Sequence, residues 1–223
     1  STAYMNLNTG VKGKTNIHIM STDVQLQDGS TCGWSEAGST DFSSKTIDPK
    51  YFKVNMAFCE KKLLSTYLNY AVKMAATENA VPFEQYWLDE ITKGINKQID
   101  TMIWQGTGSG VQFKGLVPQM LADDAVVKVT RTEGTSAYEA IKAVYAKMKE
   151  EIILAGDAMI YVSPAIFRAF IQDLVTANLY HTNATDVDGI YKIPGTNINV
   201  VAINGLVGSN AIVAARQSNL YYG

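Results

Sequence analysis

The stretch "PFEQYWLDEITKGINKQIDTMIWQGTGSGVQFKG", residues 82–115, combines the most regular apolar pattern of the chain with its densest run of glycines. Its apolar side chains recur every four residues, at Phe83, Trp87, Ile91, Ile95, Ile99 and Ile103. This spacing places them along one face of a helix, and Pro82 suits the first helical position. We therefore predict a long helix over about 83–105 that ends at Gly106.

The glycines after this helix allow two interpretations. A dinucleotide-binding loop needs a strand before its glycines and a helix N-terminus after them, because the free N–H groups of that helix bind the phosphate. Here a helix runs into the glycines, and a helix C-terminus carries partial negative charge. We therefore predict that Gly106, Gly108, Gly110 and Gly115 form a hinge or crossover between two domains, where the backbone needs φ values that glycine adopts freely.

The first 58 residues are polar and contain short alternating patches. These patches are "NIHIM" (16–20), "DVQLQ" (23–27) and "YFKVNMAF" (51–58), a pattern typical of exposed strands or a long hairpin. A two-stranded ribbon is only marginally stable alone, so we expect this region to lie on another surface. An apolar stripe after it predicts a helix over about 60–76.

Beyond residue 134 the pattern becomes mixed. Ser136 is the predicted N-cap of a helix that stops at Gly156, with a buried face of Tyr138, Ile141, Tyr145, Met148 and Ile152. The run "AMIYV" (158–162) predicts a buried strand, and Ser163-Pro164 opens a helix. The stripe of that helix is Ile166, Phe167, Phe170, Ile171, Leu174 and Val175. Strands joined at Pro194-Gly195 follow within 190–203, and another strand is predicted over 211–216.

The length, composition and charge of the chain limit the classes of protein to which it can belong. The chain has 223 residues, of which 47% are hydrophobic, so it can bury a core. A net charge of −2 gives no electrostatic footprint for wrapping nucleic acid. No apolar run reaches the ~20 residues that cross a bilayer, and the start "STAYMNLNTG" has no signal-peptide features, so we expect a soluble protein. Cys32 and Cys59 are expected to be reduced thiols.

Candidate catalytic and binding patterns are incomplete. "NTGVKGKT" (8–15) ends like a phosphate-binding loop but lacks the first glycine and leads into a strand-like pattern. Cys32 and His181, with Asn197 and Asn199 beyond them, have the spacing of a papain-like hydrolase, yet no apolar helix begins at Cys32. The two histidines and "DVDG" (186–189) do not make a metal site. We expect no enzyme activity, no cofactor and no metal.

A resemblance rests on the order of several segments. These are "KYFKVNMAFCEKKLLSTYL" (50–68), "IDTMIWQGTGSGVQFKGLVP" (99–118), "VSPAIFRAF" (162–170), "IPGTNINVV" (193–201) and "AIVAARQSNL" (211–220). In this order they resemble the major capsid protein of tailed phages with the Hong Kong 97-type fold, in particular those of Bacteroides phages. The resemblance covers nearly the whole chain.

The resemblance implies an α+β fold in three parts. Residues 1–58 would form an N-terminal arm with an extended hairpin loop within 11–52, and residues 59–120 a peripheral domain that carries the long helix. Residues 121–223 would form an α/β axial domain. The family usually adds a returning peripheral strand after the last axial strand, which we expect to be missing here because the chain stops at "LYYG". A start without methionine would fit either proteolytic maturation or a fragment of a longer protein.

The resemblance also implies a function in assembly. The chain would be a structural subunit whose hexamers and pentamers tile an icosahedral shell, enclosing DNA without sequence-specific contacts. Expected partners are neighbouring capsid subunits, portal, scaffold and maturation protease, with assembly in the bacterial host cytoplasm, a final location in the virion and no membrane contact. Some members crosslink through a Lys, and Lys45 and Lys50 lie near the predicted hairpin. An encapsulating compartment, another phage assembly protein and the papain-like hydrolase stay open as alternatives.

Overall fold

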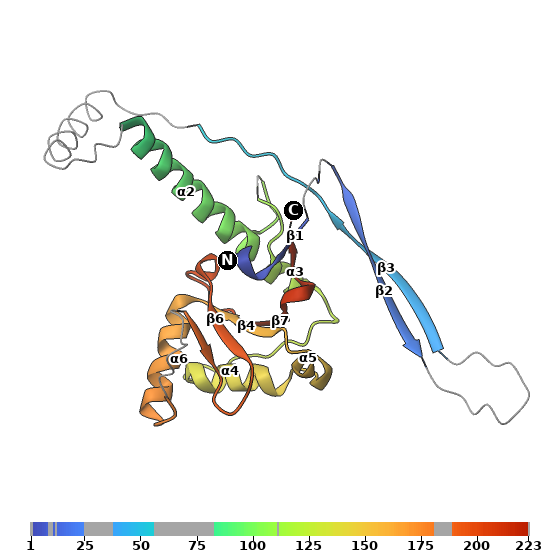
Figure 1. Cartoon of the computed structure of the whole chain (residues 1–223), viewed down its shortest axis with the longest axis vertical. Coiled ribbons are helices and arrows are strands. Elements are labelled where there is room, and N and C mark those ends of the chain that lie inside the picture. Colours follow the sequence, from blue (N-terminus) through green and yellow to red (C-terminus); the bar gives the residue numbers. More distant parts are fainter. Residues whose placement is uncertain are drawn as a thin grey trace, which may run out of the picture.

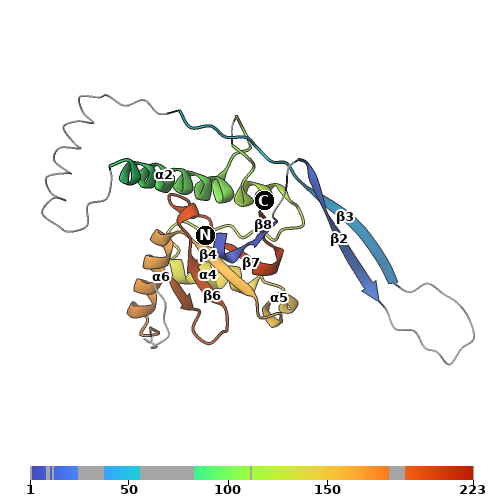
Figure 2. The same cartoon turned by 45° about the horizontal axis from the view of Figure 1, so that its top comes forward.

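A computed structural model describes residues 2–8, 11, 13–24, 38–55, 83–110, 112–180 and 189–222. Figures 1 and 2 show a body built of a small sheet and its covering helices, from which a long hairpin projects. Helix α2 (Phe83–Gln105) also extends from this body, and its C-terminal end lies against it. The helix predicted over 60–76 lies outside the described residues, as do Cys32, Cys59 and His181.

The described chain contains helices, 3-10 turns and strands of different lengths. The helices are α2 (Phe83–Gln105), α3 (Leu116–Ala122), α4 (Ala137–Ala146), α5 (Glu150–Leu154) and α6 (Pro164–Thr176), with 3-10 turns η1 (Thr2–Tyr4), η2 (Asn204–Leu206) and η3 (Gln217–Asn219). The strands are β1 (Asn6–Leu7), β2 (Thr15–Val24), β3 (Gly38–Ile47), β4 (Ala158–Val162), β5 (Ile190–Lys192), β6 (Asn199–Ala202), β7 (Val213–Arg216) and β8 (Tyr221–Tyr222).

The body is organised around a four-stranded sheet of order β5-β6-β4-β7. Strand β4 pairs parallel with β6, and α6 lies on the crossover between them. The β5–β6 and β4–β7 pairs are antiparallel. Helices on a mixed sheet confirm the predicted α+β class.

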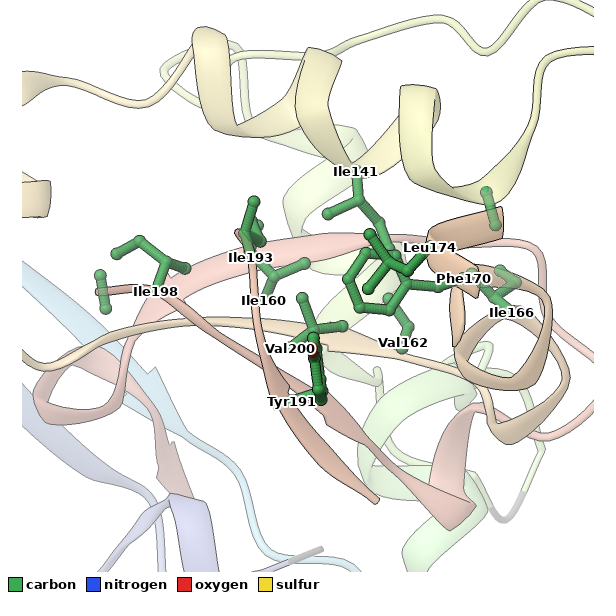
Figure 3. Packing of buried hydrophobic residues seen from close by; sticks show 12 residues of the cluster. Ile141, Ile160, Val162, Ile166, Phe170, Leu174, Tyr191, Ile193, Ile198 and Val200 are labelled. Carbon is green, nitrogen blue, oxygen red and sulfur yellow. The ribbon is translucent and has the colours of Figure 1, made fainter. Parts of the chain in front are cut away.

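Side chains along each strand point alternately to the two faces of the sheet, so the buried residues form one cluster on each face. On one face, Ile160 and Val162 of β4 pack with Phe170 and Leu174 of α6 and with Ile141 of α4, as Figure 3 shows. On the other face, Met159 and Tyr161 belong to a cluster with the end of α2. Its buried members are Met5, Ile103, Trp104, Tyr161, Val201, Ile203, Leu206, Val213 and Leu220.

The predicted long helix is confirmed over its full length, since α2 spans Phe83–Gln105 and Gly106 lies outside it. The single helix predicted from Ser136 to Gly156 is wrong, because it is two helices, α4 and α5. Lys147 closes α4, and Lys149 takes an extended backbone as the N-cap of α5. Tyr145, Met148 and Ile152 all still pack on the core, so the apolar pattern continues through the break.

Helix α6 begins and ends with two recognisable caps. The Ser163 hydroxyl accepts a hydrogen bond from the N–H of Ile166, and Pro164 follows as the first helical residue. At the other end, Leu179 N–H donates to Leu174 O at 2.9 Å and Asn178 N–H donates to Val175 O at 3.0 Å, a Schellman motif. The predicted stripe is wrong at Val175, which is 57% exposed.

Asn178 closes this motif in the left-handed region, with φ 55. We expect Asn178→Val to lower the free energy of unfolding by about 1–2 kcal/mol, because a β-branched side chain is strained there. Asn178→Gly relieves the same strain and is expected to leave stability unchanged or slightly higher. Chemical denaturation of both variants measures the difference. Equal stabilities for the Val and Gly variants would contradict this assignment.

The hairpin is a regular antiparallel ribbon, paired from Thr15↔Ile47 to Val24↔Gly38. It lies within the range in which the sequence predicts a hairpin, but its second strand differs from the prediction. The expected strand over 51–58 is wrong for its described part, because residues 51–55 form no strand. The actual partner, β3, reads "GSTDFSSKTI" and is exposed along nearly its whole length. With neither face buried, it needs no apolar alternation, so its sequence gave no strand signal.

Candidate functional site

The described residues of the glycine-rich segment, 106–110 and 112–115, form a closed turn between α2 and α3, which we name the glycine turn. Gly106 N–H donates to Met102 O at 2.9 Å, and Gly115 N–H donates to Gly106 O at 2.7 Å. Thr107 and Lys114 form an isolated antiparallel bridge inside this closure. Side-chain hydrogen bonds support the same closure, since Gln112 Oε1 accepts from both the N–H and the hydroxyl of Thr107. The segment therefore returns the chain to the end of α2 before α3 begins.

The glycines of this turn are required for two different reasons. Gly108 and Gly110 have φ of 77 and 60, the conformations that the sequence predicts. Gly106 and Gly115 are instead sites of close approach. A Cβ at Gly106 would overlap the carbonyl oxygen of Phe113, and one at Gly115 would lie 2.5 Å from the nitrogen of Gly106. The structure brings these two glycines together; their role as a hinge between domains stays a prediction.

The last turns of α2 are fixed to the sheet through η2. Trp104 is fully buried, and its ring lies 5.3 Å from that of Tyr161. Gly205 of η2 packs against the Trp104 ring so closely that a Cβ there would overlap it. The Gln105 side chain donates to the carbonyls of Gly205 at 2.7 Å and Val207 at 3.1 Å. Neither Gln105 nor Gly205 belongs to a sequence motif, so their roles could not be predicted from the sequence.

Tyr161 brings a hydroxyl into this apolar cluster. Its side chain is fully buried between Trp104 and Tyr4, whose ring centroid lies 6.2 Å from its own. No described residue offers Tyr161 Oη a hydrogen-bond partner. Burial raises the pKa of Tyr161 to about 12, with smaller contributions from Tyr4 and Asp157.

Asp157, directly before β4, joins the first strand of the sheet core to the segment after β7. Its carboxylate accepts from Arg216 Nε at 2.7 Å and from Ser218 Oγ at 2.6 Å. These bonds stabilise the ionised form, and they lower the pKa of Asp157 to about 2. These two hydrogen bonds hold η3 in place, and β8 begins two residues after η3 ends.

This arrangement predicts a specific acid response. A carboxyl whose pKa is lowered on folding stabilises the protein above its unfolded pKa, near 3.8, and loses that contribution as pH falls to about 2. We expect Asp157→Asn to lower stability at pH 7 and to flatten the fall in stability between about pH 4 and pH 2. Urea denaturation across this range measures both effects. An unchanged acid dependence in the variant would contradict the role given to Asp157.

The hairpin carries an exposed apolar pair. Met20 and Phe42 are direct cross-strand partners on one face of the ribbon, 66% and 79% exposed. Ile19, on the opposite face, is 41% exposed. We name Met20 and Phe42 the hairpin pair. No described residue covers it, although side chains of this kind are normally buried.

The base of the hairpin is held to the body by weak contacts. Lys45 Nζ lies 3.7 Å from an Asp123 carboxylate oxygen, and both side chains are exposed, so the ion pair contributes little. After β3, Phe52 meets Phe113 of the glycine turn edge-on, with ring centroids 6.1 Å apart. Lys50 pairs with Asp48 at 3.7 Å. A crosslink through Lys45 or Lys50 stays a prediction.

Among the described residues, no arrangement of side chains supports a phosphate-binding loop, a papain-like hydrolase or a metal site. Residues 15–24 form strand β2, so "NTGVKGKT" leads into a strand and not into the helix that a phosphate-binding loop needs. Cys32 and His181 lie outside the described residues, while Asn197 accepts a hydrogen bond from Lys192 at 3.0 Å and Asn199 lies in β6. Within the described ranges, no cluster of three or more His, Cys, Asp and Glu side chains could bind a metal ion. None of the helices there has the length and apolarity to cross a membrane.

Comparison with known proteins identifies a family for this chain. The family model described as "Phage capsid family" matches residues 62–178, which include α2, the glycine turn, β4 and α6. No curated protein and no solved structure was found to match the chain. The matched range covers more than half of the 223 residues. The chain therefore belongs to the phage capsid family.

Proposed function

We propose that this chain is the major capsid subunit of a tailed phage, with the Hong Kong 97-type fold and arranged as hexamers and pentamers of an icosahedral shell around DNA. The phage capsid family is a structural one, and membership places the chain among capsid subunits of the virion that assemble with one another. The icosahedral arrangement, the enclosed DNA and an origin among Bacteroides phages are the proposed part.

The hairpin pair is the observation that carries the proposal. Two strands of ten residues each span about 33 Å, and they leave the body, as Figures 1 and 2 show. Covering Met20 and Phe42 is worth about 2 kcal/mol for each side chain. A ribbon that exposes such a pair gains this free energy only from another surface. In a shell, a neighbouring subunit supplies that surface at every copy, and many repeated contacts stabilise the whole.

The proposed domains follow from the same arrangement. The hairpin would belong to the N-terminal arm, α2 to the peripheral domain, and the four-stranded sheet with α4, α5 and α6 to the axial domain. The glycine turn would be the crossover between them. The near-neutral net charge of −2 fits a shell that encloses DNA without sequence-specific contacts. Portal, scaffold and maturation protease stay expected partners, and we propose that the subunit has no enzymatic role.

Sedimentation velocity of the purified chain under capsid-assembly conditions tests this function. We expect a fast-sedimenting species of defined size, together with free subunits or capsomers. Nucleic acid in particles recovered from the phage's host would support a virion, whereas a loaded protein cargo would favour an encapsulating compartment. A single monomeric boundary at every concentration, salt and pH would count against a shell-forming subunit.

A further inference from the structure

Residues Thr2–Asn8 cross the α2 side of the sheet as a short segment, which we name the strap. It contains η1 and β1, and β1 pairs parallel with β8 through Asn6↔Tyr221 and Leu7↔Tyr222. Figure 1 places the blue strap beside the end of α2 and against the red segment that contains β8. The strap thus covers the sheet at the place where α2 is fixed to it.

The strap has few attachments. Its backbone donates from Asn6 to Leu220 O at 2.7 Å and from Asn8 to Tyr222 O at 2.9 Å. The Asn6 side-chain amide donates to the carbonyls of Ser218 at 3.0 Å and Gln217 at 3.3 Å. Two-stranded sheets are marginal in water, and parallel pairs are normally found in larger, buried sheets.

Burial under the strap is equally limited. Met5 is its one buried side chain among the described residues, while Leu7 is 58% exposed. The buried Met5, the partly buried Tyr4 and a few hydrogen bonds have to offset the conformational entropy of the whole segment. An element with so few buried contacts opens at a lower free energy than the sheet below it.

The Tyr161 hydroxyl weakens the closed strap further. Tyr161 lies under Tyr4 with its Oη buried and unpartnered among the described residues. A buried hydroxyl without a hydrogen bond carries the full cost of its lost hydration. Tyr4 is one of the two rings that enclose Tyr161, so lifting the strap uncovers this side of the side chain and relieves the cost where water reaches the hydroxyl.

We propose that the strap opens as a unit while the sheet stays folded, and that the buried Tyr161 hydroxyl sets how readily it opens. Opening uncovers the apolar surface of Tyr161 and Leu220 and frees the backbone groups of β8 that pair with β1. The strap is thus a conformational device at the junction of α2 and the sheet. This inference concerns the single subunit and does not depend on shell assembly.

Hydrogen exchange of the full unassembled chain, followed by mass spectrometry, tests the proposal. We expect the amides of Asn6 and Asn8 to exchange well before those of β4 and β6. Their exchange should also be nearly insensitive to low urea, because strap opening exposes little surface, whereas sheet exchange should accelerate. Strap and sheet amides that exchange together, with the same urea dependence, would overturn the proposal.

Variants separate the hydroxyl from general stability. Tyr161→Phe should slow strap exchange at least fivefold, because the closed state no longer buries an unpaired hydroxyl. Asn6→Ala should accelerate it about fivefold and leave β4 and β6 unchanged. Tyr145→Phe, on the opposite face of the sheet, is the matched control and should leave the strap unaffected. Unchanged or faster strap exchange in Tyr161→Phe would show that the hydroxyl does not control opening.

Discussion

Replacing both Met20 and Phe42 by serine is expected to abolish particle formation while leaving the subunit folded. The two side chains are largely exposed in the single subunit, so their removal costs it little stability. In the proposed shell they are buried against a neighbour, and losing about 4 kcal/mol for the pair at each contact raises the concentration needed for assembly at least a hundredfold. Sedimentation velocity measures assembly, and thermal unfolding of the free subunit measures the fold.

The register of the hairpin supplies a matched control. Thr22 and Thr40 are also cross-strand partners, and they lie one pair further along the same face. Thr22→Ala with Thr40→Ala changes the same ribbon without removing a large apolar side chain, so we expect assembly close to that of the unmodified chain. Normal assembly of the Met20→Ser, Phe42→Ser variant would contradict the role of the hairpin pair. Loss of assembly in both double variants would show a general defect of the hairpin.

The largest expected effect on folding is at Gly205. A Cβ there would overlap the Trp104 ring and lie 2.5 Å from the carbonyl oxygen of Asp100, so Gly205→Ala has to separate η2 from α2. Trp104 is fully buried, and side chains in close-packed protein interiors can shift little. We expect the free energy of unfolding to fall by about 3 kcal/mol or more, which exceeds the usual cost of a single substitution. Urea denaturation of the free subunit measures this change.

Gly94, in the middle of α2, provides the opposite expectation for the same substitution. Beyond the backbone of its own helix, a Cβ there has no neighbouring atom within 4 Å. Gly94→Ala should therefore raise stability by about 0.5–1 kcal/mol, through better helix propensity. A small effect at Gly205, equal to or below that at Gly94, would contradict the close packing of η2 on α2.

Elements with a buried face could be predicted from the sequence. Four-residue spacing located α2, the apolar run located β4, and Ser163-Pro164 marked the start of α6, because burial imposes a pattern on the residues that face the core. Strand β3 could not be found, since it is paired through its backbone and exposed on both faces. The break between α4 and α5 was hidden for the opposite reason: the side chains on both sides of it still reach one core.

The site residues divide in a similar way. Gly108 and Gly110 could be explained from their local context, because a sharp turn after a helix requires left-handed backbone. The importance of Gly106, Gly115 and Gly205 depends on atoms that only the folded chain brings near them. Met20 and Phe42 could be recognised as cross-strand partners only from the register of β2 and β3, which no sequence pattern specified.

Electron microscopy of the assembled full-length chain tests the central claim, that this chain forms a shell through its projecting hairpin. The account predicts closed particles of uniform diameter in which the β2–β3 ribbon of each subunit lies on a neighbour, with Met20 and Phe42 at the contact. Monomers under every assembly condition would contradict it. So would closed particles in which the ribbon touches no neighbouring subunit.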